Sequence, residues 1–198
     1  DLIESGLVKP EDMPRFIGHI KTDAARLVSL VSDIIRLSQL DENTEMSWEN
    51  VDALSVAKEA LEMVGPIAES RNISLTIEGE PAPLTSVHKL LYDIIYNLCD
   101  NAVKYNKEGG FVKVNVKTAG GKVQVAVSDN GVGIAPVDQS RVFERFYRVD
   151  KSHSRESGGT GLGLSIVKHA VAYLKGSISL ESTLGKGTTI TVSFPAEK

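Results

Sequence analysis

The chain has 198 residues, of which 41% are hydrophobic and 24% charged, and its formal net charge is −4. This length suffices for one substantial core plus a smaller element, and the acidic balance gives no electrostatic basis for binding nucleic acid or an anionic membrane surface. The single cysteine, Cys99, excludes an internal disulfide and fits a reducing compartment. No apolar run approaches the ~20 residues of a membrane span, and because the chain starts at Asp1 we expect a piece of a longer protein.

The first predicted element is one long helix over Pro14–Leu40. Apolar residues recur along it at steps of three and four, which is the spacing of a coiled-coil seam. One helix cannot bury such a stripe by itself, so the stripe predicts a partner, as in a four-helix bundle. Its members are Ile17, Ile20, Ala24, Leu27, Val31 and Ile34, widened by Leu30 and Leu37.

A polar linker at 41–46 separates this helix from a region of mixed helices and strands. Alternating apolar residues predict strands, and apolar residues at helical spacing predict helices. Gly65-Pro66 is expected to end or kink the first of these helices. The predicted strands are Ser47–Val51, Ile73–Ile77, Phe111–Lys117, Lys122–Ser128, Ser177–Ser182 and Thr188–Phe194, and the predicted helices are Ala53–Arg71, Lys89–Tyr105 and Ser165–Leu174. This order predicts an α+β fold, a two-layer sandwich whose mixed, mostly antiparallel sheet carries helices on one face.

The predicted helix Lys89–Tyr105 carries a polar face. Asn97, Asn101 and Lys104 lie three or four residues apart, so two amides and an ammonium group share one side. Buried amides need partners, and this face suits a hydrated divalent cation and a phosphate chain. A solvated helix face is an equally good interpretation of this cluster when it is taken alone.

A second cluster, Asp129-Asn130-Gly131-Val132-Gly133, leaves the end of a predicted strand. The aspartate can point its carboxylate into a pocket, and the glycines let a ligand approach the backbone. A carboxylate there would suit the exocyclic amine of adenine. An ordinary tight turn is the commoner use of such residues, and for this cluster alone it is the favoured interpretation.

A third cluster, Gly158-Gly159-Thr160-Gly161-Leu162-Gly163, runs into a helix, where free backbone N–H groups and the helix dipole favour phosphate. Alone, it also fits a flexible surface loop. Two familiar glycine motifs are excluded. A dinucleotide fingerprint starting at Gly159 would need glycine where Leu164 stands, and a P-loop would need Ser or Thr where Gly187 follows Lys186.

Together, in this order, the three clusters resemble the N box, the Asp-x-Gly-x-Gly box and the Gly-x-Gly-x-Gly box of the sensor histidine kinases of two-component systems. The wider group includes DNA gyrase, a family of heat-shock chaperones and the mismatch-repair protein MutL. Three further matches extend the resemblance over essentially the whole chain. Phe143–Arg148 resembles the phenylalanine-rich box, Gly185–Thr189 the final glycine turn, and Leu37–Asp41 the end of the second helix of the dimerisation and phosphotransfer hairpin.

The resemblance implies a Bergerat-type domain that binds ATP with Mg²⁺. Asn97 would coordinate the metal and Asn101 would support it, while Lys104 and Arg148 would act with Asn97 in phosphoryl transfer. Asp129 would bind the adenine amine. The further nucleotide contacts that the resemblance implies are Tyr105, Gly131, Gly133, Ile134, Lys151, Gly159, Thr160, Gly161, Leu162, Gly163 and Thr188.

The resemblance also implies the organisation of the whole protein. Residues 1–41 would be part of the dimerisation hairpin, residues 42–198 the catalytic domain, and residues 149–157 a lid over ATP. In the intact homodimer, the γ-phosphoryl group would pass to a histidine of the dimerisation domain and then to an aspartate of a response regulator. The chain would be the cytoplasmic portion of a membrane-anchored sensor.

The phosphoacceptor histidine is expected to lie before Asp1. In this family it is followed by an acidic residue and then by a stretch ending in Pro-Leu. His19 is followed by Ile20-Lys21-Thr22 and is expected to be an exposed helix residue. His88, His153 and His169 lie outside the hairpin. We therefore expect this chain to bind ATP without phosphorylating itself.

Two alternatives remain open. One is an ATP-hydrolysing relative of the same superfamily. Such relatives place a glutamate base where this chain has Asn97, and an amide cannot take a proton from water, so Asn97 favours phosphoryl transfer. The other is a degenerate module that dimerises without binding nucleotide, and the retained box residues argue against it.

Overall fold

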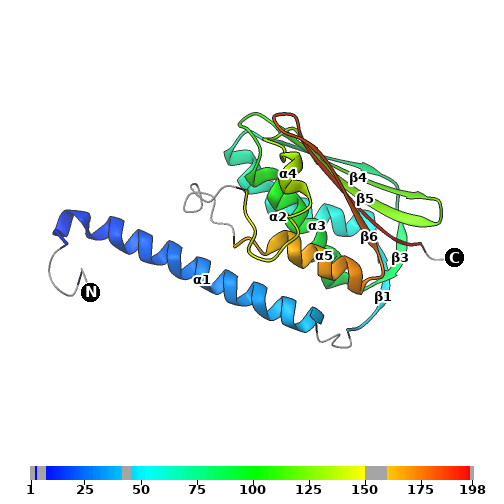
Figure 1. Ribbon diagram of the computed structural model, residues 1–198, viewed down its shortest axis with the longest axis horizontal. Coiled ribbons are helices and arrows are strands. Elements are labelled where there is room, and N and C mark those ends of the chain that lie inside the picture. Colours follow the sequence, from blue (N-terminus) through cyan, green and yellow to red (C-terminus); the bar gives the residue numbers. More distant parts are fainter. Residues whose placement is uncertain (1–2, 4–7, 42–45, 150–159, 197–198) are drawn as a thin grey trace.

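The computed structural model describes residue 3 and residues 8–41, 46–149 and 160–196. A long helix leads into a sandwich in which one layer is a sheet and the other consists of helices (Figure 1). The α+β architecture predicted from the order of the elements is therefore confirmed.

Helix α1, Met13–Asp41, follows a short 3₁₀ turn, η1, at Pro10–Asp12. Figure 1 shows it as a rod that extends well beyond the sandwich. Leu37 and Leu40, near its C-terminal end, are buried against the rest of the chain. Leu30 is partly buried beside Leu37. Ile17, Ile20, Leu27, Val31 and Ile34 of the predicted seam remain accessible to a partner, since they are between 47% and 62% exposed.

The main sheet has five strands in the order β2-β4-β5-β7-β6. β2 pairs with β4 in parallel, and the other neighbours pair antiparallel. The sheet is therefore mixed and mostly antiparallel, as predicted. Its strands are β2 (Ser74–Gly79), β4 (Phe111–Ala119), β5 (Lys122–Asp129), β6 (Ser177–Thr183) and β7 (Gly187–Pro195).

Helices α2 (Ala53–Ser70), α3 (His88–Lys104) and α5 (Gly163–Tyr173) form the second layer on one face of this sheet (Figure 1). Burial alternates along β4 and β5, so that every second residue points at the helices. The core lies between the layers. It includes Val112, Val114, Val116, Val123 and Val125 from the sheet and Leu91, Ile94, Ile95 and Cys99 from α3.

Helix α2 ends within one residue of its predicted boundary at Arg71. Of the two effects expected of Gly65-Pro66, ending the helix is excluded, because the helix continues through Pro66 to Ser70. Pro66 and Glu62, whose carbonyl loses its intrahelical partner, both lie on the exposed side of the helix, where water can satisfy that carbonyl. Val64 and Ala68 stay buried on the opposite side, so packing carries the helix past the proline.

Three short elements complete the described fold. β1 (Glu49–Asp52) pairs with β3 (Pro83–Ser86) in a separate two-stranded sheet, and α4 (Pro136–Gln139) follows β5. The sequence predicted a strand close to β1 but neither β3 nor α4, because four residues are too few to show a period. Trp48, just before β1, stacks on Tyr173 of α5 with ring centroids 6.1 Å apart.

Candidate functional site

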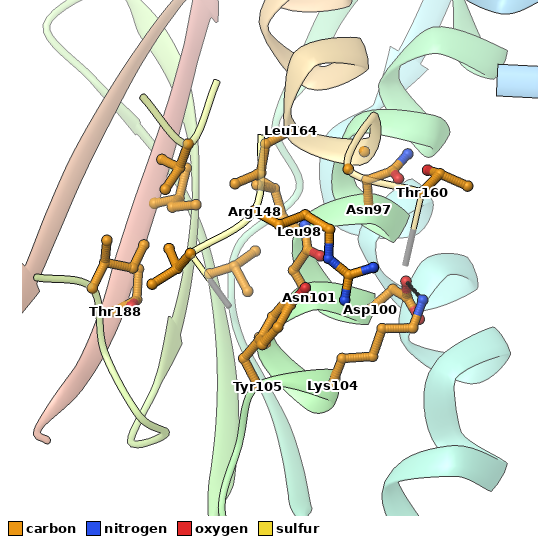
Figure 2. A pocket seen from close by; sticks show the side chains of 18 of the residues that line it. Asn97, Leu98, Asp100, Asn101, Lys104, Tyr105, Arg148, Thr160, Leu164 and Thr188 are labelled. Carbon is orange, nitrogen blue, oxygen red and sulfur yellow. Dashed lines mark hydrogen bonds and ion pairs between the residues drawn. The ribbon is translucent and has the colours of Figure 1, made fainter. Parts of the chain in front are cut away.

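A pocket of about 550 Å³ opens between α3, the N-terminus of α5 and the end of β5 (Figure 2). Most of the residues singled out in the sequence line it, although they come from segments far apart in the chain. Its lining includes Asn97, Asn101, Lys104, Tyr105, Asp129, Gly133, Ile134, Arg148, Val149, Thr160, Gly161, Gly163 and Thr188.

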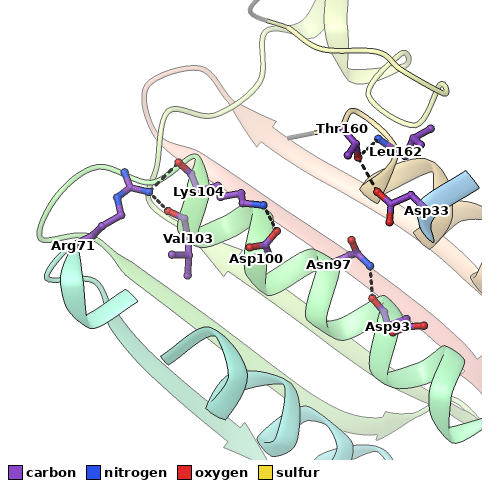
Figure 3. Close-up of polar contacts among 9 residues, drawn as sticks. All are labelled: Asp33, Arg71, Asp93, Asn97, Asp100, Val103, Lys104, Thr160 and Leu162. Carbon is purple, nitrogen blue, oxygen red and sulfur yellow. Dashed lines mark hydrogen bonds and ion pairs between the residues drawn. The ribbon is translucent and has the colours of Figure 1, made fainter. Parts of the chain in front are cut away.

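Helix α3 supplies the polar wall. The amide nitrogen of Asn97 donates to the backbone oxygen of Asp93 at 2.7 Å, which leaves the amide oxygen for the pocket (Figure 3). The ammonium of Lys104 lies 2.6 Å from the Asp100 carboxylate, one turn back on the same helix. Cys99 is on the buried side, where burial raises the pKa of its thiol to about 12. The predicted division of this helix into a polar and an apolar face is present.

The end of β5 supplies the opposite wall. Asp129 accepts a hydrogen bond from the backbone N–H of Gly131 at 2.8 Å. Burial raises the pKa of this carboxyl group above its ordinary value of 3.8, against the lowering effect of backbone hydrogen bonds from Gly131 and Thr188. A half-buried acceptor at the end of a strand is suited to a donor on a ligand.

The glycines after Asp129 allow close backbone packing. Gly133 has φ +67°, and a Cβ there would overlap the backbone oxygen of Thr183. Gly131 does not line the pocket, because it lies against the backbone oxygen of Tyr105, where a Cβ would not fit. Gly131 thus holds a supporting position behind the wall.

The glycine-rich segment enters the pocket at the start of α5. The hydroxyl of Thr160 accepts from the backbone N–H of Leu162 at 3.2 Å. Gly163 faces α3, and a Cβ there would lie 3.0 Å from the side-chain oxygen of Asn97. Leu162 itself turns away from the pocket and packs with Leu37, so its side chain is a docking residue.

Helix α1 contributes a third wall that the sequence did not predict. Ser29, Asp33 and Arg36 line the pocket, and the Asp33 carboxylate accepts a hydrogen bond from the Thr160 hydroxyl at 2.9 Å (Figure 3). Arg36 lies 3.7 Å from Asp93 of α3. These three residues are spaced three or four apart beside the apolar seam, but spacing alone does not reveal what such a polar stripe faces.

Contacts at the C-terminal end of α1 hold this helix against the sandwich. The carboxylate of Asp41 lies 2.7 Å from Arg145 and 3.3 Å from the imidazole of His169 on α5. His169 therefore takes part in this contact. His19 is exposed on α1, as expected, and His88 lies 3.4 Å from Glu59.

Some predicted residues lie outside the described part of the chain. These are Lys151, Gly159 and His153, together with most of the predicted lid at 149–157. Among the residues that the structure does describe, the helices are too short or too polar to cross a bilayer.

Residues 86–198 match the family model described as "Histidine kinase-, DNA gyrase B-, and HSP90-like ATPase". Sensor-like histidine kinase SenX3 of Mycolicibacterium smegmatis is 39% identical over 188 residues, which make up 94% of this chain and 49% of that protein. Sensor histidine kinase WalK of Bacillus subtilis is 34% identical over 205 residues, covering 98% of this chain and 32% of that protein. The chain thus spans half or less of the length of these relatives.

Solved structures agree with this assignment. Full-length ShkA in complex with AMPPNP superimposes with a TM-score of 0.82 at 26% identity, over 93% of this chain and 39% of that chain. The histidine kinase AdeS of Acinetobacter baumannii gives a TM-score of 0.81 at 21% identity, over 100% of this chain and 91% of that chain, which supports the fold. The chain therefore belongs to the histidine kinase-, DNA gyrase B- and HSP90-like ATPase family, and its ATP-binding domain is of the sensor histidine kinase type.

Proposed function

We propose that the pocket binds ATP with Mg²⁺ and that, in the full-length protein, the γ-phosphoryl group passes to a histidine of the dimerisation domain. One observation carries the proposal. A single pocket brings together the amide and lysine face of α3, the half-buried carboxylate of Asp129 and the glycine-rich start of α5. Each of these groups suits a different part of the nucleotide.

The Asp129 end suits the adenine. Its carboxylate accepts hydrogen bonds only, so it recognises the exocyclic amine and rejects a carbonyl at the same position. Tyr105, Ile134 and Ile190 provide apolar surface for the flat ring, and Thr188 adds a hydroxyl. This end would therefore favour adenine over guanine.

The start of α5 suits the phosphates. Backbone N–H groups at a helix N-terminus, together with the positive end of the helix dipole, attract negative charge. Thr160, Gly161 and Gly163 lie at this end of the pocket, and Lys104 and Arg148 are among the basic residues that line it. Lys104 would exchange its Asp100 partner for a phosphate oxygen when the nucleotide binds.

The residues present fit a magnesium ion held mainly by phosphates. Mg²⁺ prefers oxygen ligands, keeps several waters and uses few protein groups when it accompanies a nucleotide. Asn97 offers its side-chain oxygen, because its amide nitrogen is bound to Asp93. When bound, the ion would neutralise charge that develops on the phosphate oxygens.

The chemistry favours transfer over hydrolysis. Asn97 has no proton-accepting group of useful basicity, and the Asp33 carboxylate accepts a hydrogen bond from the Thr160 hydroxyl. In the transfer, the bond from the γ-phosphorus to the bridging oxygen breaks and a bond to an imidazole nitrogen forms, with ADP leaving. Binding and alignment of ATP are this chain's contribution.

The partners follow from the same proposal. The accessible seam of α1 supports homodimerisation through a helical bundle. The relatives are sensor kinases, so we propose a response regulator as the final phosphoryl acceptor and a membrane-anchored sensor protein with this part in the cytoplasm.

Asn97→Ala tests the metal site. Nucleotide affinity measured with Mg²⁺ should fall about tenfold, equivalent to about 1.4 kcal/mol, while affinity measured in EDTA should change little. Asn115→Ala on β4 removes an amide outside the pocket lining and is the matched control. Equal losses with and without Mg²⁺ would remove Asn97 from the metal.

Phosphate release tests the choice of reaction. The chain should bind ATP without steady release of inorganic phosphate. Continuous turnover that Asn97→Ala leaves unchanged would instead assign the chain to the hydrolysing branch.

A further inference from the structure

Arg71 lies outside the pocket, at the C-terminal end of α2, yet its guanidinium group holds the end of α3. Its Nη1 donates to the backbone oxygens of Val103 and Lys104, the latter at 2.9 Å (Figure 3). Its Nη2 donates to the backbone oxygen of Asn106 at 2.8 Å. The last carbonyls of a helix lack intrahelical donors and carry the negative end of its dipole. A fixed cation at this place therefore holds the final turn of α3.

The α3 wall and the wall formed by the Asp129 loop both depend on this last turn of α3. Lys104 and Tyr105 line the pocket with their side chains. The backbone oxygen of Tyr105 accepts from the N–H of Val132, at 3.1 Å, in the loop that follows Asp129. Gly131 of the same loop fits closely against that oxygen.

A second link runs through Asn106, which is 5% exposed. Its amide nitrogen donates to the backbone oxygen of Phe111 at 2.9 Å, and the N–H of Phe111 donates to the Asn130 side chain at 2.7 Å. Hydrogen bonds thus connect the turn that Arg71 contacts to the Asp129 loop in two ways. One connection ends at Val132 and the other at Asn130.

We propose that Arg71 is a positioning residue of the nucleotide site, which sets the spacing between the α3 wall and the Asp129 loop. The inference rests on the proposed function of the pocket. Three acceptors in different directions match the planar, forked donors of arginine, whereas the single ammonium of lysine cannot reach them in the same way. Arg71→Lys should therefore keep the positive charge but lose the simultaneous hydrogen bonds to the three backbone oxygens.

Hydrogen exchange at the Val132 amide tests the link without any nucleotide. Arg71→Lys should accelerate exchange at this amide by about tenfold, while amides in the β4–β5 core keep their wild-type rates. Lys58→Ala removes an exposed cation from the same helix and should leave the Val132 rate unchanged. Wild-type exchange at Val132 in Arg71→Lys would overturn the inference.

A double-mutant cycle tests the functional consequence. Arg71→Lys should weaken binding of AMPPNP by at least about fivefold, because small displacements of binding groups are costly. If Arg71 acts through the last turn of α3, its effect should shrink in a Tyr105→Ala background but persist in an Asn97→Ala background. If Arg71→Lys weakened AMPPNP binding equally in the Tyr105→Ala and Asn97→Ala backgrounds, Arg71 would only stabilise the fold in general. That result would contradict the inference.

The two experiments separate this inference from the proposed function. If the wild-type chain does not bind AMPPNP, the proposed function fails, and the exchange measurement still decides whether Arg71 holds the loop. Arg71→Ala, followed by its melting temperature, is a stronger disruption, but the conclusion depends on Arg71→Lys.

Discussion

At the scale of single residues, Asp129 illustrates a conflict between stability and binding. Its carboxylate is partly withdrawn from water, and burial raises its pKa, so the folded chain favours the neutral acid relative to the unfolded chain. The bond from Gly131 recovers part of that cost. We propose that an ionised acceptor is retained in this half-buried place because it suits a ligand donor.

Asp129→Asn should weaken ATP binding, because an amide replaces the charged acceptor. The loss of one charge-assisted hydrogen bond is worth roughly 1.5–3 kcal/mol, or about 10- to 150-fold in affinity. Calorimetric titration at pH 7 measures it, with exposed Asp23→Asn on α1 as the control. Unchanged affinity would remove Asp129 from the adenine site.

The same substitution should raise the free energy of unfolding at pH 7. In the unfolded chain Asp129 ionises near 3.8 and in the folded chain at a higher pH, so the wild type loses stability as pH rises between the two values. The stabilities of wild type and Asp129→Asn should therefore converge below about pH 3.8 and diverge above it. Denaturant unfolding at several pH values checks this, and a variant less stable than wild type at pH 7 would contradict it.

Gly133 and Gly121 separate two roles of glycine. Both have φ close to +70°, but a Cβ on Gly121 would meet open space, whereas one on Gly133 would overlap the backbone of Thr183. Gly121→Ala should cost about 1–2 kcal/mol from the left-handed conformation, and Gly133→Ala about 2 kcal/mol more from the overlap. Equal losses of unfolding free energy would show that the loop next to Asp129 has room to move.

At the scale of elements, α1 joins the sandwich through a small contact. Leu37 packs with Leu162 and Ile166, and the pairs Asp33–Thr160 and Asp41–Arg145 flank it. The glycine-rich segment thus has a pocket face and a docking face. This explains why Leu162 belongs to the docking contact while its glycine neighbours line the pocket.

Leu37→Ala should loosen this contact. Truncating a buried leucine costs about 2–5 kcal/mol, so α1 should sample undocked positions while the sandwich stays folded. Spin labels on cysteines replacing Asp23 and Glu181 report the distance between α1 and β6, since Cys99 is buried. The distance distribution should broaden in Leu37→Ala and not in Ile34→Ala, whose side chain is half exposed. An unchanged distribution would show that polar contacts alone hold α1.

At the scale of the whole molecule, the periodic parts of the sequence predicted the fold well. Strands β4 and β5 alternate over most of their length, and α3 separates an amide face from an apolar one, so the type of each element followed from its pattern. The sequence left open whether Pro66 ends or only kinks α2, because tertiary packing decides this. The short elements β3 and α4 were not predicted, because their sequences show no period.

The candidate site was predictable to a different degree on each wall. Asn97, Asp129 and Gly163 stood out through residue type and spacing. The α1 wall, including Asp33, did not, because which surface a polar stripe meets depends on how two distant elements dock. The same holds for Arg71, whose contacts lie 32 to 35 residues along the chain.

The most direct test of the central claim is a calorimetric titration of this chain with a non-hydrolysable ATP analogue, with Mg²⁺ and in EDTA. We predict saturable binding at one site per chain that Mg²⁺ strengthens and that Asp129→Asn weakens. Absence of binding in both conditions, with the chain folded, would contradict the assignment of the pocket as a nucleotide site.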